Sequence, residues 1–228
     1  MRRAALVLLA LTLAGCGSSG GGQLKVSAAA SLQRAFGAYD SHASYSFAGS
    51  DQLAAQIRAG ARPDVYAAAN TALPESLYRA RVAGRPVVFA RNRLVLATRS
   101  PHVRSLADAA RRGVTVAMGA PTVPVGAYAR RVLAGTPFGK RILANVRSQE
   151  PDVAGVVGKL EQGAVDAGFV YATDARAAGL RTVPLPHAVV SYAVAVVRPG
   201  AAAERFVRGL LSGRGRQALL RAGFLPPA

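Results

Sequence analysis

The sequence contains few of the residues on which several classes of protein depend. Its 228 residues include one cysteine, three histidines, no tryptophan and 11 acidic side chains. A single cysteine excludes a disulfide scaffold and any metal site built from several thiolates. The histidines, His42, His102 and His187, are isolated from one another, which gives no support to a histidine-based metal site. We therefore expect no cofactor and no metal ion bound directly by side chains.

Catalytic motifs are also absent. The sequence has neither the G-x-S-x-G elbow of serine hydrolases nor the H-E-x-x-H pattern of zinc proteases. Residues 135–141 resemble a phosphate-binding loop, but three residues rather than four separate the glycines, and arginine follows Lys140. This segment is therefore predicted to be a turn between two helices. The chain is expected to be a binding protein rather than an enzyme.

Positive charge is abundant but dispersed. The 29 basic residues give a formal net charge of +18, yet they form no block of five, and aromatic residues make up only 6% of the chain. Nucleic-acid binding usually needs a basic cluster or aromatic platforms for the bases, so nucleic acid is not an expected partner. The arginines are interpreted as a solvated surface, which could lie near anionic lipid headgroups.

The N-terminus has the layout of a secretory signal. Two arginines precede an apolar run at residues 4–14, which is too short to span the roughly 30 Å hydrocarbon core of a membrane. The following L-A-G-C at residues 13–16 resembles the lipobox of bacterial lipoproteins, in which the cysteine is lipidated. Residues 1–22 are therefore predicted to be a lipoprotein signal peptide and a flexible tether, with lipidation at Cys16. This predicts an extracytoplasmic protein anchored to the outer face of the cell membrane.

From residue 24 onward, short apolar strands alternate with helical stretches, and the hydrophobic content of 51% is enough for a packed core. This alternation predicts an α/β fold with largely parallel sheets covered by helices. The expected strands are residues 24–28, 44–47, 64–68, 114–118, 167–171 and 182–184, and the clearest helices are residues 31–39, 50–59, 74–81 and 201–220.

Two segments, residues 86–98 and 189–198, are longer and rich in β-branched residues. Each lies between stretches that could form separate sheets, so we predict that the chain crosses there from one lobe to another and later returns. Lobe 1 is expected to contain residues 23–90 and 188–228, and lobe 2 residues 91–187. The alternative is a single doubly wound sheet with two long central strands.

The loops between strands and helices are rich in small residues. Ser31 follows the first strand, Ser50 the second, and the loops at residues 119–126 and 151–153 precede further helices. Each loop alone reads as an ordinary helix cap. Together they predict several converging helix N-termini, whose unpaired N–H groups and partial positive charge favour an anion.

The same loops are free of positive charge. Residues 26–33, 47–57 and 117–129 contain no lysine or arginine. A buried arginine would hold a dianion strongly but would be costly to desolvate, whereas neutral donors can bind it through many hydrogen bonds and still release it. The loops therefore predict a site for a compact oxyanion bound by dipoles rather than by ion pairs.

Several of these segments, in the same order along the chain, carry a family resemblance. They include VSAAASL from Val26, FARNRLVLA from Phe89, VAMGAPTVPVGAYA from Val116, and EPDVAGVVGKLEQGAVDAGFVYATDA from Glu150. The sequence resembles the molybdate-binding proteins of bacterial ABC importers. The resemblance implies the two-lobed type II periplasmic-binding-protein fold, with each lobe a mostly parallel sheet flanked by helices. It also implies a tetrahedral dianion in the cleft between the lobes.

The resemblance also implies which residues bind the anion. By motif, Ser31 and Ser50 would donate hydroxyl and backbone hydrogens from lobe 1. Val125 and Val153 would donate backbone N–H groups, and Tyr171 would donate its phenol.

Two positions depart from the family pattern. Ala120 stands where the family often has aspartate, and Asn70 replaces the aspartate of an S-A-D stretch. Neither change removes a proposed donor, although both bear on how the loops are held.

The implied function is that of an extracytoplasmic binding component of a molybdate and tungstate importer. Its partners would be the oxyanion, an ABC permease with its ATPase, and the membrane through the lipid anchor, with the protein itself a monomer. Closure of the lobes would hinge near residues 91–93 and 191–193. Two alternatives stay open, namely a receptor for sulfate or thiosulfate and an extracytoplasmic enzyme or adhesion module.

The substitution Ser50→Ala tests this assignment. Loss of the hydroxyl should leave a buried acceptor of the anion unpaired, which weakens binding by about 1–3 kcal/mol. The change is measured by calorimetric titration, and an unchanged affinity would remove Ser50 from the site.

Overall fold

The computed structural model describes residues 22–227. Most of the predicted signal peptide and tether, including the lipidation site Cys16, lies outside these residues. Within the described part, no helix combines the length and apolar character needed to cross a membrane.

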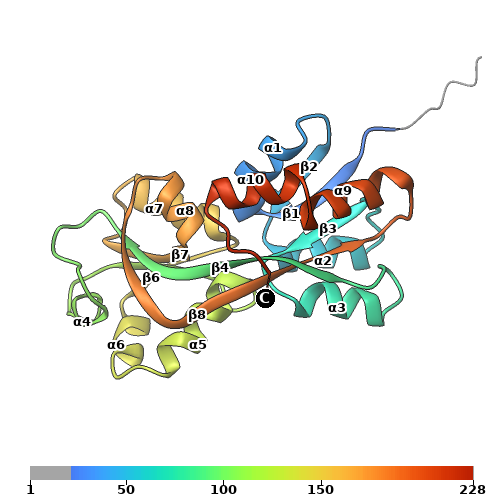
Figure 1. Ribbon diagram of the computed structural model, residues 1–228. Helices are drawn as coiled ribbons and strands as arrows, with labels where there is room; N and C mark the ends of the chain where they lie inside the picture. The colour runs from blue at the N-terminus through green and yellow to red at the C-terminus, as the bar shows by residue number, and fades with distance from the viewer. Residues whose placement is uncertain (1–21, 228) are drawn as a thin grey trace, which may run out of the picture.

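Eight strands alternate with helices along the chain (Figure 1). The strands are β1 (Lys25–Ala29), β2 (Ser44–Ala48), β3 (Val65–Ala68), β4 (Val87–Thr98), β5 (Val116–Gly119), β6 (Val146–Glu150), β7 (Ala167–Tyr171) and β8 (Arg181–Val196). The helices are the short 3-10 turn η1 (Ala30–Leu32), α1 (Gln33–Tyr39), α2 (Ser50–Arg58), α3 (Ala72–Arg79), α4 (Leu106–Ala109), α5 (Pro124–Ala134), α6 (Gly139–Ala144), α7 (Val153–Glu161), α8 (Ala172–Ala177), α9 (Ala201–Leu211) and α10 (Arg214–Ala222).

The strands lie in the order β2-β1-β3-β8-β4-β7-β5-β6. Strands β1, β2 and β3 are parallel to one another, and so are β5, β6 and β7. The second set repeats the arrangement of the first, because in each the strand that comes first along the chain lies in the middle. We call β1–β3 with α1–α3, α9 and α10 the first half, and β5–β7 with α4–α8 the second half. Helices cover both faces of each half (Figure 1).

The long antiparallel strands β4 and β8 join the two halves. The end of β8 pairs with β3 through Val194↔Ala67, and the end of β4 pairs with β7 through Val95↔Val170. The hydrogen-bonded sheet is therefore continuous, yet it carries two lobes on either side of the crossing strands (Figure 1). The predicted α/β fold with helix-flanked, mostly parallel strands is confirmed. The two long central strands of the alternative, a single sheet, are also present in this strand order.

The crossing strands meet where the sequence predicts a hinge. Arg91 pairs with Ser191 and Asn92 with Val190, and shifts in register flank these pairs. The lobe boundaries at residues 90 and 187 and the hinge itself remain predictions.

Three local predictions differ from the structure. Residues 182–184 and 189–196 belong to one strand, β8, whose first part pairs only with β4, and the predicted strand 189–198 ends two residues earlier than expected. Proline is tolerated on such an edge because no neighbour there needs its missing N–H group. The predicted helix at 201–220 is two helices, because Gly213 adopts φ +90° and reverses the chain.

Strand β6 was not expected, since its sequence VRSQE is polar and lies at the sheet edge.

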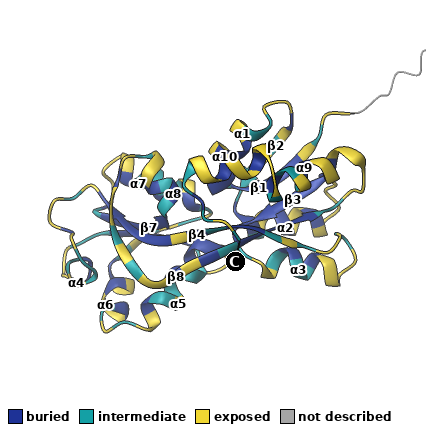
Figure 2. Cartoon of the chain, viewed as in Figure 1, coloured by how far each residue is buried: buried dark blue, intermediate teal, exposed yellow. Residues whose placement is uncertain are grey.

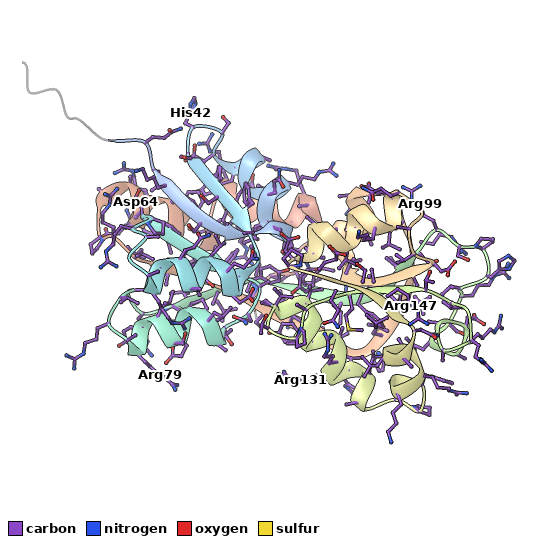
Figure 3. The ribbon with its side chains drawn as sticks, turned by 180° about the vertical axis from the view of Figure 1, so that it is seen from behind. His42, Asp64, Arg79, Arg99, Arg131 and Arg147 are labelled. Carbon is purple, nitrogen blue, oxygen red and sulfur yellow. The ribbon has the colours of Figure 1, made fainter. Side chains whose placement is uncertain are left out.

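The core follows the strands and the inner faces of the helices (Figure 2). In the first half, Phe36 of α1 is fully buried and packs its ring against Tyr45, Phe89 and Phe206, at centroid distances of 5.4 to 6.1 Å. The basic side chains lie outside this core, and the arginines labelled in Figure 3 come from different sides of the molecule. This agrees with the dispersed charge expected from the sequence.

Candidate functional site

A narrow cavity of about 20 Å³ lies where the two halves meet. A single buried water needs about 10–15 Å³ by a comparable measure, so the cavity suits only a compact guest. Its walls come from the loops after β1, β2, β3, β5 and β6 and from the end of β7. All five predicted binding residues are among the lining residues, which are Ala29, Ala30, Ser31, Ala48, Gly49, Ser50, Ala69, Val123, Pro124, Val125, Asp152, Val153 and Tyr171.

A larger groove of about 470 Å³ lies beside this cavity, between α1, α7, α8 and α10. It shares Ser31 with the cavity, but its lining includes the charged side chains of Arg34 and Glu161. The predicted donors from both halves border the smaller cavity, which is therefore the candidate site.

Helix N-termini from both halves border the cavity. Helix α2 begins at Ser50 and η1 at Ala30 in the first half, while α5 begins at Pro124 and α7 at Val153 in the second. The first N–H groups of a helix have no partner within it and carry a partial positive charge. This is the edge of the sheet at which α/β proteins usually bind ligands.

The caps at these helices leave backbone donors available. Asp152 caps α7 as its residue type predicts, because its Oδ1 accepts a hydrogen bond from the Gly155 N–H at 2.9 Å. Serine is also a common N-cap residue, but neither Ser31 nor Ser50 is one here. Ser31 lies inside η1, and Ser50 is the first residue of α2 after Gly49. At η1, α2 and α5, no side chain of the N-cap residue accepts a hydrogen bond from the first N–H groups.

Strand β3 and the loop after it hold Ser50 in place. The Ala69 N–H donates to Ser50 Oγ at 3.1 Å, and the Tyr66 hydroxyl donates to the Ser50 carbonyl at 2.6 Å. Because Ser50 Oγ accepts the bond from Ala69, its own proton remains available to a guest.

Tyr171 contributes a buried phenol with no partner. Its side chain is 1% exposed, and its hydroxyl has no hydrogen-bond partner in residues 22–227. Burial, assisted by the neighbouring Tyr192, raises the pKa of Tyr171 well above its ordinary value, so the group stays a neutral donor. Buried polar atoms without partners are rare in proteins, and a cavity-lining one indicates a ligand contact.

Close backbone approach between the halves requires glycine at position 49. A Cβ atom there would lie 2.5 Å from the Pro151 carbonyl oxygen and 3.1 Å from Val123 Cγ1. Both neighbours belong to the second half, so Gly49 allows the loops of the two halves to come together.

The loop before α5 is held by backbone groups and by one arginine. The Ala120 N–H donates to the Glu150 carbonyl at 2.8 Å, and Arg130 Nη1 donates to the carbonyls of Gly119 and Gly126. The loop is thus fixed although Ala120 lacks the family's carboxylate. The other departure also keeps a local role, since Asn70 Oδ1 accepts from the Leu73 N–H at 3.1 Å.

The electrostatics of the cavity match the prediction of a site without cations. No lysine or arginine is among its lining residues, and Asp152 is the one charged residue there. In the described chain, no group of three or more histidine, cysteine, aspartate or glutamate residues could hold a metal ion.

A second acidic group, Asp174, lies in the first turn of α8, just after Tyr171. Burial, with a smaller contribution from Asp152, raises its pKa to about 7, although hydrogen bonds from the Asp174 and Tyr171 N–H groups oppose the shift. Its Oδ2 atom is buried without a partner. At neutral pH this carboxyl group is therefore partly protonated, which limits negative charge next to Tyr171.

Comparisons with known proteins agree with this geometry. The family model for bacterial extracellular solute-binding proteins matches residues 25–225. The chain belongs to this family. Within it, the molybdate-binding protein ModA of Mycobacterium tuberculosis H37Rv is 34% identical, over 96% of this chain and 95% of its own length. The same values hold for ModA of Mycobacterium bovis.

Solved structures show the same solute-binding fold. The periplasmic molybdate-binding protein of Azotobacter vinelandii has a TM-score of 0.78 at 23% identity, with 90% of this chain and 100% of that chain covered. The sulfate-binding protein SubI of M. tuberculosis H37Rv has a TM-score of 0.81 at 15% identity, with 90% and 86% covered. The fold and the family expected from the sequence are thus confirmed.

Sequence reasoning missed three buried or loop-fixing residues, namely Tyr192, Asn92 and Arg130. Tyr192 lies 2.9 Å from Ser31 Oγ but is 161 residues away in the chain. No local pattern marks such a pair, whereas Arg130, four residues after Gly126 on α5, follows ordinary helical spacing.

Replacing Gly49 by alanine should weaken anion binding by about 1–3 kcal/mol, because the added methyl group opposes contact between the halves. Calorimetric titration measures the affinity, and thermal unfolding without anion should change little. The matched control is Gly37→Ala on α1, where an added Cβ meets no atom within 4 Å. Equal affinities for both variants would contradict the prediction.

The raised pKa of Asp174 predicts how stability depends on pH. The unfolded chain loses this proton near the ordinary value of 3.8, whereas the folded protein keeps it up to about 7. Stability should therefore fall as the pH rises from 4 to 7, by up to about 4 kcal/mol, and should fall no further above that range.

Asp174→Asn should flatten this decline and raise the unfolding temperature at pH 8, as measured by thermal unfolding from pH 4 to 8. The same change at Asp108, whose pKa is lowered by hydrogen bonds from the Arg104 N–H and Ser105, should leave the decline in place. A decline that persists in Asp174→Asn would show that another group causes it.

Proposed function

We propose that this protein is the extracytoplasmic substrate-binding component of an ABC importer for molybdate and tungstate. The observation that carries the proposal is the small cavity, which is bordered by neutral donors from both halves and by no lysine or arginine. The 34% identity to mycobacterial molybdate-binding proteins supports molybdate as the anion.

In this proposal, five residues share the oxygens of the anion. Ser31 and Ser50 donate their hydroxyl and backbone hydrogens, Val125 and Val153 donate backbone N–H groups, and Tyr171 donates its phenol. These donors replace the hydration shell of the dianion without the desolvation cost of a buried cation. A site of this kind can bind the anion and still release it to a transporter.

Binding closes the two lobes on the anion. Because the donors come from both halves, an anion held by one half favours the conformation in which the other half also reaches it. The predicted lobes, residues 23–90 with 188–228 and residues 91–187, would rotate about the paired crossing strands, with the hinge at residues 91–93 and 191–193.

The closed protein then delivers the anion to a membrane permease driven by its ATPase. Family membership supports an extracytoplasmic location. Lipidation of Cys16 would hold the protein at the outer face of the membrane, and one protomer is sufficient because a single chain contributes every proposed donor.

A sulfate receptor is the second candidate. The fold of the sulfate-binding protein SubI is as similar to that of this chain as the fold of the A. vinelandii molybdate-binding protein is. At 15% sequence identity, this similarity shows the fold alone. Neutral donors around a compact cavity suit either tetrahedral dianion, so direct binding must separate the two.

The test is calorimetric titration of the purified protein with molybdate, tungstate, sulfate and phosphate. Molybdate and tungstate, which are similar in size and charge, should bind with comparable affinity and much more tightly than the other two. Tight binding of sulfate without binding of molybdate would establish the second candidate instead. Absence of binding and of any anion-induced thermal shift would favour a role without transport.

Tyr171→Phe should separate the ligand role of this residue from a structural role. Removal of an unpartnered buried hydroxyl should leave the empty protein as stable as before or more so. Anion binding should weaken by about 1.5–3 kcal/mol, the usual contribution of a hydrogen bond to a charged group. Thermal unfolding and calorimetry measure the two effects.

The matched control is Tyr45→Phe, because the Tyr45 hydroxyl donates to the carbonyls of Phe36 and Asp40. This variant should lose stability and keep its affinity. If Tyr171→Phe behaves in the same way as Tyr45→Phe, Tyr171 is a structural residue rather than a ligand residue.

A further inference from the structure

A buried pair of hydroxyl groups lies next to the cavity. Ser31 Oγ and the Tyr192 hydroxyl are 2.9 Å apart, and the two residues are 7% and 0% exposed. Ser31 lines the cavity, whereas Tyr192, on the crossing strand β8, does not. Tyr192 therefore acts on the site through Ser31.

The other neighbours of Tyr192 are mostly aromatic. Its ring packs edge-on against Phe89, Phe224 and Tyr171, at centroid distances of 5.3 to 6.3 Å. Phenylalanine would fill this space equally well. The hydroxyl group is thus the part of the side chain that packing does not explain, and a buried hydroxyl is costly unless it forms hydrogen bonds.

The Tyr192 hydroxyl keeps its proton, because burial raises its pKa well above the ordinary value. On the other crossing strand, the buried Asn92 donates through Nδ2 to Thr173 Oγ1 of α8 at 2.8 Å. Hydrogen bonds thus join β8 to the first half at Ser31 and β4 to the second half at Thr173.

The chemistry of these groups sets the direction of the hydrogen bonds. In the empty protein either hydroxyl of the Ser31–Tyr192 pair can donate, since each is both donor and acceptor. An oxyanion can only accept, so when Ser31 gives its single proton to the anion, Tyr192 is the donor to Ser31 Oγ. Ser31 Oγ accepts this bond, and its own proton is left free to point into the cavity.

We propose that Tyr192 is a positioning residue of the anion site, whose hydroxyl donates to Ser31 Oγ and so keeps the Ser31 proton directed at the oxyanion. The proposal rests on the proposed function, since it concerns the orientation of one donor to that anion. It adds a residue that does not touch the ligand and that belongs to the strands joining the two lobes.

The test is a double-mutant cycle with Tyr192→Phe and Ser31→Ala, read by calorimetric titration with molybdate. Tyr192→Phe alone should weaken binding about tenfold, since it removes the bond that orients a donor to a charged group. In the Ser31→Ala background the same change should have no further effect, because no hydroxyl remains to be oriented. A merely structural role would weaken binding equally in both backgrounds.

Tyr39→Phe is the matched control, since the Tyr39 hydroxyl donates to the Phe206 carbonyl at 3.0 Å, away from the cavity. It should lower the unfolding temperature without changing affinity. If Tyr192→Phe does not fold, Tyr192→Leu, which also lacks the hydroxyl, is measured with and without Ser31 in the same cycle, with the same loss of effect expected.

The inference is overturned if the wild-type protein binds molybdate and Tyr192→Phe binds it equally well, or if the loss is the same with and without Ser31. If the wild-type protein binds none of the four anions, the proposed function fails and the inference fails with it. The wild-type titration therefore distinguishes the two failures.

Discussion

The candidate site depends on buried hydrogen-bonding groups that have no partner within the protein. In the described residues, the buried side-chain atoms without a partner are Asp51 Oδ1, Tyr171 OH and Asp174 Oδ2. Each belongs to a cavity-lining residue or lies within three positions of one in the sequence. Nearly all buried polar groups in folded proteins have hydrogen-bond partners. Unpartnered groups close to the candidate site therefore cost free energy of folding, as is common at functional sites. A guest with acceptor oxygens would provide a partner for the Tyr171 hydroxyl, the phenol donor among the three.

The scaffold brings equivalent loops of the two halves to this place. The middle strands β1 and β5 are followed by the loops of Ser31 and Val125, which therefore correspond to each other. The outer strands β2 and β6 are followed by the loops of Ser50 and Val153, which correspond in the same way. The third parallel strand ends at the cavity in each half, near Ala69 and at Tyr171 respectively. The sequence shows no repeat, yet the topology repeats, because a parallel sheet with crossover helices presents its loops at one edge irrespective of side-chain identity.

Much of this arrangement follows from local signals in the sequence. Alternating strands and helices, small residues in the loops and the absence of cations at residues 26–33, 47–57 and 117–129 were sufficient to predict an α/β fold and a site of neutral donors, whereas the two-lobed binding-protein fold and the individual donors were implied by the family resemblance. The polar edge strand β6 and the reversal at Gly213 were missed because the first has no apolar alternation and the second depends on a single glycine.

What the sequence could not provide is pairing over long distances. The contact of Ser31 with Tyr192 and that of Asn92 with Thr173 join residues 161 and 81 positions apart. Their types are common in buried strands, and nothing in their neighbourhood marks them as partners. Only the tertiary fold reveals that polar residues of the crossing strands support the cavity from behind.

The return of the chain along β8 also fixes the order in which the protein can form during synthesis. The end of β8 pairs with β3, α10 packs beside α1, and Leu225 exchanges backbone hydrogen bonds with Arg91. The first lobe therefore stays incomplete until the last residues of the chain are available to fold. Strands β5, β6 and β7 pair only with one another and with β4, so the second lobe can be complete before the first, whose sheet lacks β8 and whose helix layer lacks α9 and α10 until the end of the chain arrives.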